Sequence, residues 1–154
     1  MIETVDMIRF VEELSGRPKA RSAVVMTHDY VKQKPWAAEL ARQTGAAHLH
    51  LLDRFSEDPE LAGELSRFSI SHFFDFLPKQ CNGKLLIVSG MEFLKATWSG
   101  QDSATQELAR RIQTWNRSPC LLFVLQYDNA LASYDFGSRY QYQFIVDQKE
   151  TYQL

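Results

Sequence analysis

The sequence predicts an α/β domain of three layers, with a mainly parallel, five-stranded sheet between two layers of helices. Short runs of consecutive apolar residues at 85–88 and 120–125 are typical of strands that are buried on both faces. Segments between such runs carry apolar residues at helical spacing. Strands that alternate with helices in this way usually form parallel pairs through right-handed crossovers.

Length and composition indicate one globular domain. The chain has 154 residues, of which 45% are hydrophobic and 23% are charged. A chain of that size buries a sizeable core without disulfides or metals. We therefore expect a single α/β domain over residues 1–154, with an N-terminal helix at 4–15 and a core at 20–150.

Charge and targeting signals favour a cytoplasmic protein. The net charge of −2 gives no bulk attraction to nucleic acid or to an anionic membrane. The first residues include Glu3 and Asp6 where a signal peptide would carry basic residues, and no apolar run is long enough to span a membrane. Cys81 and Cys120 lack the spacing of metal ligands, so we expect two reduced thiols.

The first half of the chain is predicted to alternate helices and strands. Pro35 suits the first helical position, and Gly45 suits a helix C-cap. Asp53 and Arg54 are expected to close the second strand. The expected elements are a helix at 4–15, a strand at 22–27, a helix at 36–43 and a strand at 46–52.

The second half continues the pattern. A long helix is expected from Asp58 to Pro78, and a second helix should begin at Ser103, in a capping box with Gln106. Aromatic residues gather in the first of these helices, where they indicate core packing or a groove for a partner: Phe68, Phe73, Phe74 and Phe76. The expected strands are 85–88, 120–125 and, at the sheet edge, 142–146.

The loop after the first strand occupies the place of a phosphate-binding loop. Such a loop needs glycines, a lysine for the outer phosphates and a hydroxyl for magnesium, in the pattern G-x-x-x-x-G-K-[ST]. Residues 28–35 place His28 and Gln33 at the glycine positions, Lys34 at the lysine and Pro35 at the hydroxyl. Two interpretations stay open. The loop is an ordinary surface loop with solvated lysines, or His28, Lys32 and Lys34 retain contact with phosphate.

The strand at 85–88 has the outline of a Walker B strand without its acidic end. A nucleotide hydrolase holds magnesium with an acidic residue at that end. Here Ser89 and Gly90 stand at those positions, and Glu92 follows two residues later. With both magnesium positions lost, we expect no catalytic residues and do not expect ATP or magnesium as cofactors.

The order of elements, the degenerate loop, the strand LLIVSGMEFL, the unit at 115–125 and the segment 132–142 resemble BrxF, the small P-loop protein family of BREX phage-defence operons. More broadly, the chain is similar to RecA- and AAA-like P-loop domains. The resemblance implies a P-loop-NTPase-like fold and an accessory subunit in a prokaryotic DNA-processing or defence complex. The family's loop binds nucleotide, and this chain departs from it at both glycines and at the hydroxyl.

Other residue groups suggest further sites. His48 and His50 lie on one face of a strand, with Asp53 close by, and indicate either hydrogen-bonded histidines or a metal site; we expect no metal. We expect these histidines to lie mid-strand, away from the carboxyl edge of the sheet. Basic and aromatic residues near the end of the 103–115 helix and in the tyrosine-rich final quarter are candidates for DNA or partner contact: Arg110, Arg111, Trp115, Arg117, Tyr134, Arg139 and Tyr140.

Together these observations favour a non-catalytic P-loop-like accessory subunit that acts by protein–protein contact. Two alternatives remain. The chain is a nucleotide-binding switch or weak NTPase that uses Lys34, His28 and Asp29, or it is a direct DNA-binding module. Ligands of such sheets bind at the carboxyl ends of the strands, so the positions of interest are 28–34, 53–54, 89–92 and 126–129.

Overall fold

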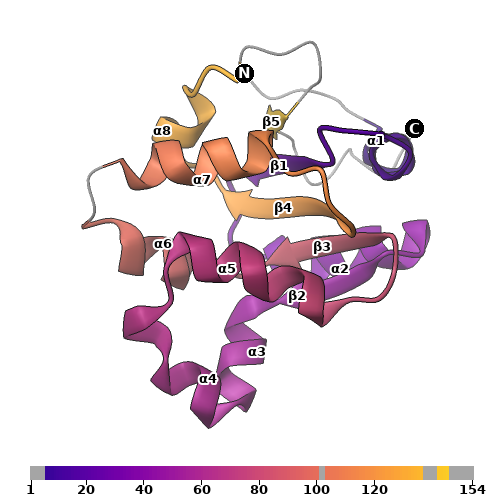
Figure 1. Cartoon of the computed structure of the whole chain (residues 1–154). Helices are drawn as coiled ribbons and strands as arrows, with labels where there is room; N and C mark the ends of the chain where they lie inside the picture. The colour runs from indigo at the N-terminus through magenta and orange to yellow at the C-terminus, as the bar shows by residue number, and fades with distance from the viewer. Residues whose placement is uncertain (1–5, 101–102, 137–141, 146–154) are drawn as a thin grey trace.

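The computed structural model describes residues 6–100, 103–136 and 142–145. They form an α/β structure in which helices cover both faces of a parallel sheet (Figure 1). Four strands lie in the order β2 (Ala47–His50), β3 (Leu85–Ser89), β4 (Cys120–Gln126) and β1 (Ser22–Thr27). A short segment, β5 (Gln143–Ile145), runs parallel to β1 on its far side.

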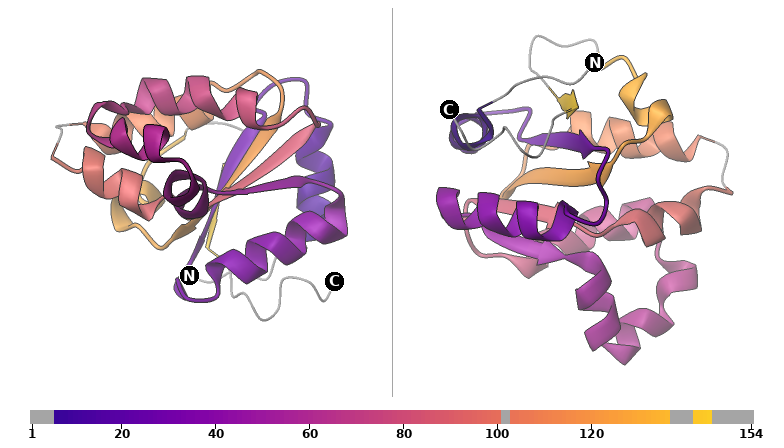
Figure 2. Two further views of the ribbon diagram at one scale, coloured as in Figure 1. Left: turned by 90° about the horizontal axis from the view of Figure 1, so that it is seen from below. Right: turned by 180° about the vertical axis from the view of Figure 1, so that it is seen from behind.

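The central strands are buried on both faces, as the apolar runs predict. All six residues of β1 and all five of β3 are buried. Alternate residues of each strand enter different hydrophobic cores, so that Val24 and Met26 lie in one core while Ala23 and Val25 lie in the other. Figure 2 (left) shows the sheet nearly edge-on with helices on either side.

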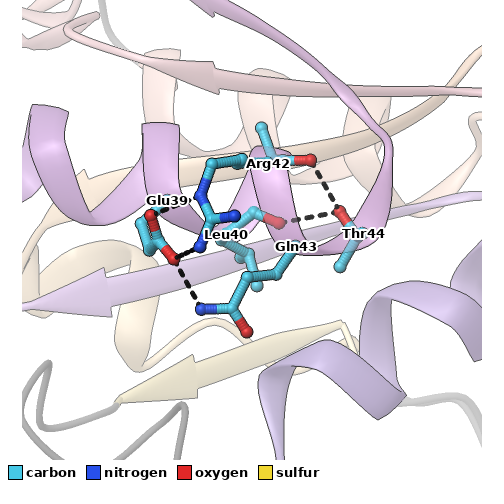
Figure 3. Close-up of polar contacts among 6 residues, drawn as sticks. Glu39, Leu40, Arg42, Gln43 and Thr44 are labelled. Atoms are coloured by element: carbon cyan, nitrogen blue, oxygen red, sulfur yellow. Dashed lines mark hydrogen bonds and ion pairs between the residues drawn. The ribbon is translucent and has the colours of Figure 1, made fainter.

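One face of the sheet is covered by two helices, α1 (Met7–Ser15) and α2 (Gln33–Thr44). The carboxylate of Asp6 caps α1 by accepting from the Arg9 N–H. Gly45 ends α2 in the left-handed conformation at φ 74°, as the sequence predicts. On the outer surface of α2, Glu39 accepts hydrogen bonds from Arg42 and Gln43 (Figure 3).

The other face carries the larger core. It is rich in aromatic rings, and Phe73, Phe74 and Trp98 are almost fully buried there. The elements after β2 that supply this layer are α3 (Leu51–Glu57), α4 (Pro59–Gly63), the 3-10 helix η1 (Leu65–Arg67), α5 (Ile70–Phe76), the 3-10 helix η2 (Leu77–Gln80), α6 (Glu92–Trp98), α7 (Ala104–Gln113) and α8 (Asn129–Ala132). The aromatic residues predicted at 68–76 therefore contribute to core packing, with Phe76 only partly buried.

The long helix expected from Asp58 to Pro78 is broken. Asp58 does cap a helix, but α4 ends at Gly63 and a new helix, α5, begins after Ser69. Ser69 and His72 form a reciprocal capping box, in which each side chain bonds the backbone N–H of the other residue. Because these side chains satisfy the N–H groups that a continuous helix would use, the chain turns at this point.

Three local predictions are wrong. The strand expected at 46–52 ends at His50, and Leu51 starts α3. The helix expected at 36–43 begins earlier, at Gln33, so Pro35 is its third residue rather than its first. The capping box at Ser103 does not form: its backbone is left-handed, with φ 71°, whereas a capping side chain normally sits on an extended backbone.

Candidate functional site

A partly buried polar network lies at the carboxyl ends of β3 and β4, and Gln33 of α2 is its centre. The Gln33 side chain is 1% exposed and reaches from the start of α2 towards the end of β3. Its Oε1 accepts a hydrogen bond of 2.7 Å from the Gly90 N–H, and its Nε2 donates to Oε2 of Glu92 at 2.8 Å. Gln33 stands at the second glycine position of the phosphate-loop pattern. Its side chain thus fills the space next to Gly90.

Glu92 connects this network to β4. Its Oε2 also accepts a hydrogen bond of 2.8 Å from the backbone N–H of Gln126, the last residue of that strand. Its Oε1 is buried and accepts no hydrogen bond from any residue in the described part of the chain. Glu92, the acidic residue near the degenerate Walker B strand, therefore links Gln33 of α2 to the end of β4.

Ser89 lies between two histidines. Its hydroxyl is 2.7 Å from Nε2 of His48 and 2.7 Å from Nδ1 of His50. The hydroxyl has one hydrogen to donate, so at least one of the two imidazoles donates to Ser89 Oγ. Both histidines share one face of β2, as alternation predicts, but they do not lie away from the carboxyl edge: β2 has only four residues, and His50 is its last.

Burial keeps both of these imidazoles neutral near pH 7. Desolvation is the main cause that lowers the pKa of His48 to about 4, and the nearby His50 lowers it further. Burial also lowers the pKa of His50, against the opposing effect of Asp53. A serine within 2.7 Å of histidine resembles an activated nucleophile. Ser89 is 0% exposed, however, so a substrate has no access to its hydroxyl and the contact is structural.

Lys34, the surviving residue of the phosphate-loop pattern, forms an ion pair with Asp53 of α3. Both side chains are about half exposed. The hydrogen bond from Lys34 is the main cause that holds the pKa of Asp53 below its ordinary value. The ammonium group that would meet an outer phosphate is thus engaged with a carboxylate of the same chain.

The other predicted loop residues lie in solvent. His28 and Lys32 are exposed, and they do not join the Gln33 network. The His28 ring stacks on Tyr127 at a centroid distance of 4.9 Å. The Lys32 backbone N–H donates to the Asp29 carboxylate at 3.2 Å, which closes the turn before α2.

The structure describes five of the seven residues proposed for DNA or partner contact. Trp115 is buried, its Nε1 donates to the Pro119 carbonyl at 2.9 Å, and the Arg117 guanidinium lies over the Trp115 ring.

The other candidates lie on α7 and in the final quarter of the chain. Arg110 and Arg111 occupy the last turn of α7. Tyr134 is partly buried and packs edge-on against Phe136. Arg139 and Tyr140 lie outside the described residues.

The described residues contain no group of three or more His, Cys, Asp or Glu side chains that could hold a metal ion. Cys81 and Cys120 are both free thiols, and Cys120 is buried. Within 6–100, 103–136 and 142–145, none of the helices is both long and apolar enough to cross a membrane.

Sequence reasoning missed the central role of Gln33. It located the loop, the strand end at Ser89 and the acid at Glu92, but treated Gln33 only as a lost glycine. The signal was weak, because a single glutamine before a helix is common on protein surfaces. The His48–Ser89–His50 contact had a clearer signal in the alternation of the two histidines, but the expected strand was too long to place them at the edge.

No protein-family model matches the chain, and no curated protein is significantly similar to it.

Proposed function

We propose that this chain is a non-catalytic, P-loop-like accessory subunit that acts through protein–protein contact. The observation that carries the proposal is the position of Gln33, whose amide fills the space beside Gly90 and bonds to it. Phosphate binding needs backbone N–H groups that converge on an open space. Here the Gly90 N–H, at the end of β3, already donates to Oε1 of Gln33.

The order of the strands supports a P-loop-like origin. One strand, β4, lies between β1, which precedes the degenerate loop, and β3, which has the Walker B outline. The short β5 segment pairs with β1 on the side away from β4. The resemblance to BrxF gives the proposed setting, a prokaryotic DNA-processing or phage-defence complex.

The alternative of a nucleotide-binding switch has less support. It requires Lys34 to reach a phosphate, but Lys34 is paired with Asp53. It also requires a magnesium ligand at the loop, where Pro35 offers neither a hydroxyl nor an N–H. We therefore favour a non-catalytic role, in which the chain keeps the P-loop-like fold but does not bind or hydrolyse nucleotide.

The degenerate loop also supplies the proposed contact surface. Tyr30 is 40% exposed and Val31 is 85% exposed, in the turn where a working loop would enclose phosphate. Leu52, after β2, is the third large hydrophobic residue that is exposed among those described. Exposed apolar residues at one edge of a domain are suited to a protein interface.

Co-expression tests this role. The chain would be produced together with the proteins encoded beside its gene, and complexes would be isolated by size-exclusion chromatography. Val31→Asp should abolish a complex that forms with the wild type while leaving the melting temperature unchanged. Ala62→Asp, on the exposed surface of α4, is the matched control and should retain the complex. Equal retention by both variants would contradict the proposed surface.

A further inference from the structure

Three loops at the opposite edge of the sheet carry positive charge. Three loops lead into β3, β4 and β1, and they comprise residues 81–84, 114–119 and 16–21. None of them contains Asp or Glu, although the whole chain has a net charge of −2. We call these three loops the amino edge; its cations are Arg17, Lys19, Arg21, Lys84 and Arg117.

Backbone hydrogen bonds hold the three loops side by side. The Arg21 N–H donates to the Trp115 carbonyl at 2.9 Å, and the Cys120 N–H donates to the Lys84 carbonyl at 2.9 Å. The Arg21 side chain also donates from Nε to the Arg117 carbonyl at 3.2 Å. The three loops therefore form one continuous surface, although Arg21 and Arg117 are 96 positions apart in the chain.

The last turn of α7 extends this surface. The helix ends at Gln113, directly before the 114–119 loop, so Arg110 and Arg111 lie at the same end of the sheet. Cations in the last turn also complement the helix dipole. That local effect accounts for two arginines on α7, but it does not account for Lys19 and Lys84, which precede strands.

Most of these charges are not neutralised within the protein. Lys19, Lys84 and Arg117 are exposed, and none of them forms an ion pair with a described residue. Arg17 differs, since it is buried and pairs with Glu13. At the carboxyl edge the pattern is reversed, because Lys34 pairs with Asp53 and Lys95 with Asp128.

The chemistry of this surface fits a chain of phosphates better than a protein. The exposed large hydrophobic side chains of the described residues, Tyr30, Val31 and Leu52, all follow strands and none lies on the amino edge. Protein interfaces usually have an apolar or aromatic centre. Single-stranded nucleic acids stack on exposed aromatic rings, whereas Trp115 is buried under Arg117. A duplex backbone needs only spaced cations.

We propose that the amino edge binds the phosphate backbone of duplex nucleic acid without sequence specificity. Lys19, Lys84 and Arg117 contact phosphates directly, and Arg110 and Arg111 extend the footprint along α7. This surface is separate from the contact surface at Tyr30 and Val31, so one edge of the sheet would face DNA while the other faces a protein.

Fluorescence anisotropy with labelled 30-base-pair duplexes of two unrelated sequences tests the proposal. The wild type should bind both equally at low salt, and affinity should fall steeply as salt rises. Lys19→Gln/Lys84→Gln should weaken binding about tenfold and reduce the slope of log K against log salt by about 2, since each phosphate contact contributes about 0.9. Neither side chain forms a hydrogen bond or ion pair with another described residue, so both substitutions should leave the melting temperature unchanged.

The matched control removes two exposed cations elsewhere. Lys32→Gln/Arg67→Gln carries the same net charge as the test variant and should bind like the wild type. No binding to either duplex at 50 mM salt would overturn the proposal, as would equal losses in the two variants. Tighter binding to single strands, or retention of poly-glutamate in preference to DNA, would overturn the choice of a duplex partner. Anisotropy with an A-form RNA duplex shows whether the amino edge binds DNA in particular or the phosphate backbone of any duplex.

Discussion

The imidazole of His50 occupies the space where a side chain at Gly90 would begin. A Cβ atom at Gly90 would lie 2.5 Å from Cε1 of His50, and Gly90 has φ of 69°, a conformation that other residues rarely adopt. The histidine that bonds Ser89 therefore also depends on the absence of a side chain at the next residue.

Gly90→Ala should accordingly destabilise the protein by about 2–4 kcal/mol, from backbone strain together with overpacking. Urea unfolding monitored by circular dichroism measures this loss. His50→Ala combined with Gly90→Ala removes the clash but not the strained φ, so the two changes should be less than additive. A loss below 1 kcal/mol for Gly90→Ala would contradict the observed packing.

Gln33→Ala should cost about 2–3 kcal/mol of unfolding free energy. It leaves the Gly90 N–H without its acceptor and removes one donor to the Glu92 carboxylate, and unsatisfied buried groups are costly. Gln43→Ala, an exposed glutamine on the same helix, is the control and should cost less than 0.5 kcal/mol. Equal effects of the two substitutions in urea unfolding would show that Gln33 does not connect the strand ends.

Acid should destabilise the fold through His48 and His50. The folded-state pKa of His48 is about 4, below the ordinary value of about 6.5, so the unfolded chain binds more protons as pH falls between these values. The free energy of unfolding should thus decrease from pH 7 towards pH 4. His48→Gln/His50→Gln should lose less over the same range, while carboxylate titration remains common to both proteins. Parallel pH profiles would refute this contribution.

Lys34→Ala should raise the pKa of Asp53 towards its ordinary value, because the hydrogen bond from Lys34 is the main cause of the lowered pKa. NMR titration of the Asp53 carboxyl carbon measures the shift directly. Lys32→Ala, which removes an exposed ammonium from the preceding loop, is the control and should leave that pKa nearly unchanged. An unchanged titration in Lys34→Ala would mean that the ion pair does not persist in solution.

The sequence predicted the layered α/β architecture well, because β1, β3 and β4 are continuous apolar runs that only a doubly covered sheet accommodates. It predicted the second strand and the following helices less well. Leu51 and Leu52 directly follow β2 but belong to α3, and the break at Ser69 depends on a side-chain contact with His72. The Gln33–Gly90 contact joins residues 57 positions apart, and no local pattern encodes it.

Isothermal titration calorimetry with ATP and magnesium tests the central proposal most directly, namely that the degenerate loop does not bind nucleotide. We expect no measurable heat of binding at ATP concentrations up to about 1 mM, a range that covers typical substrate affinities, and no release of phosphate. Magnesium-dependent binding at micromolar concentration, accompanied by turnover, would contradict the claim.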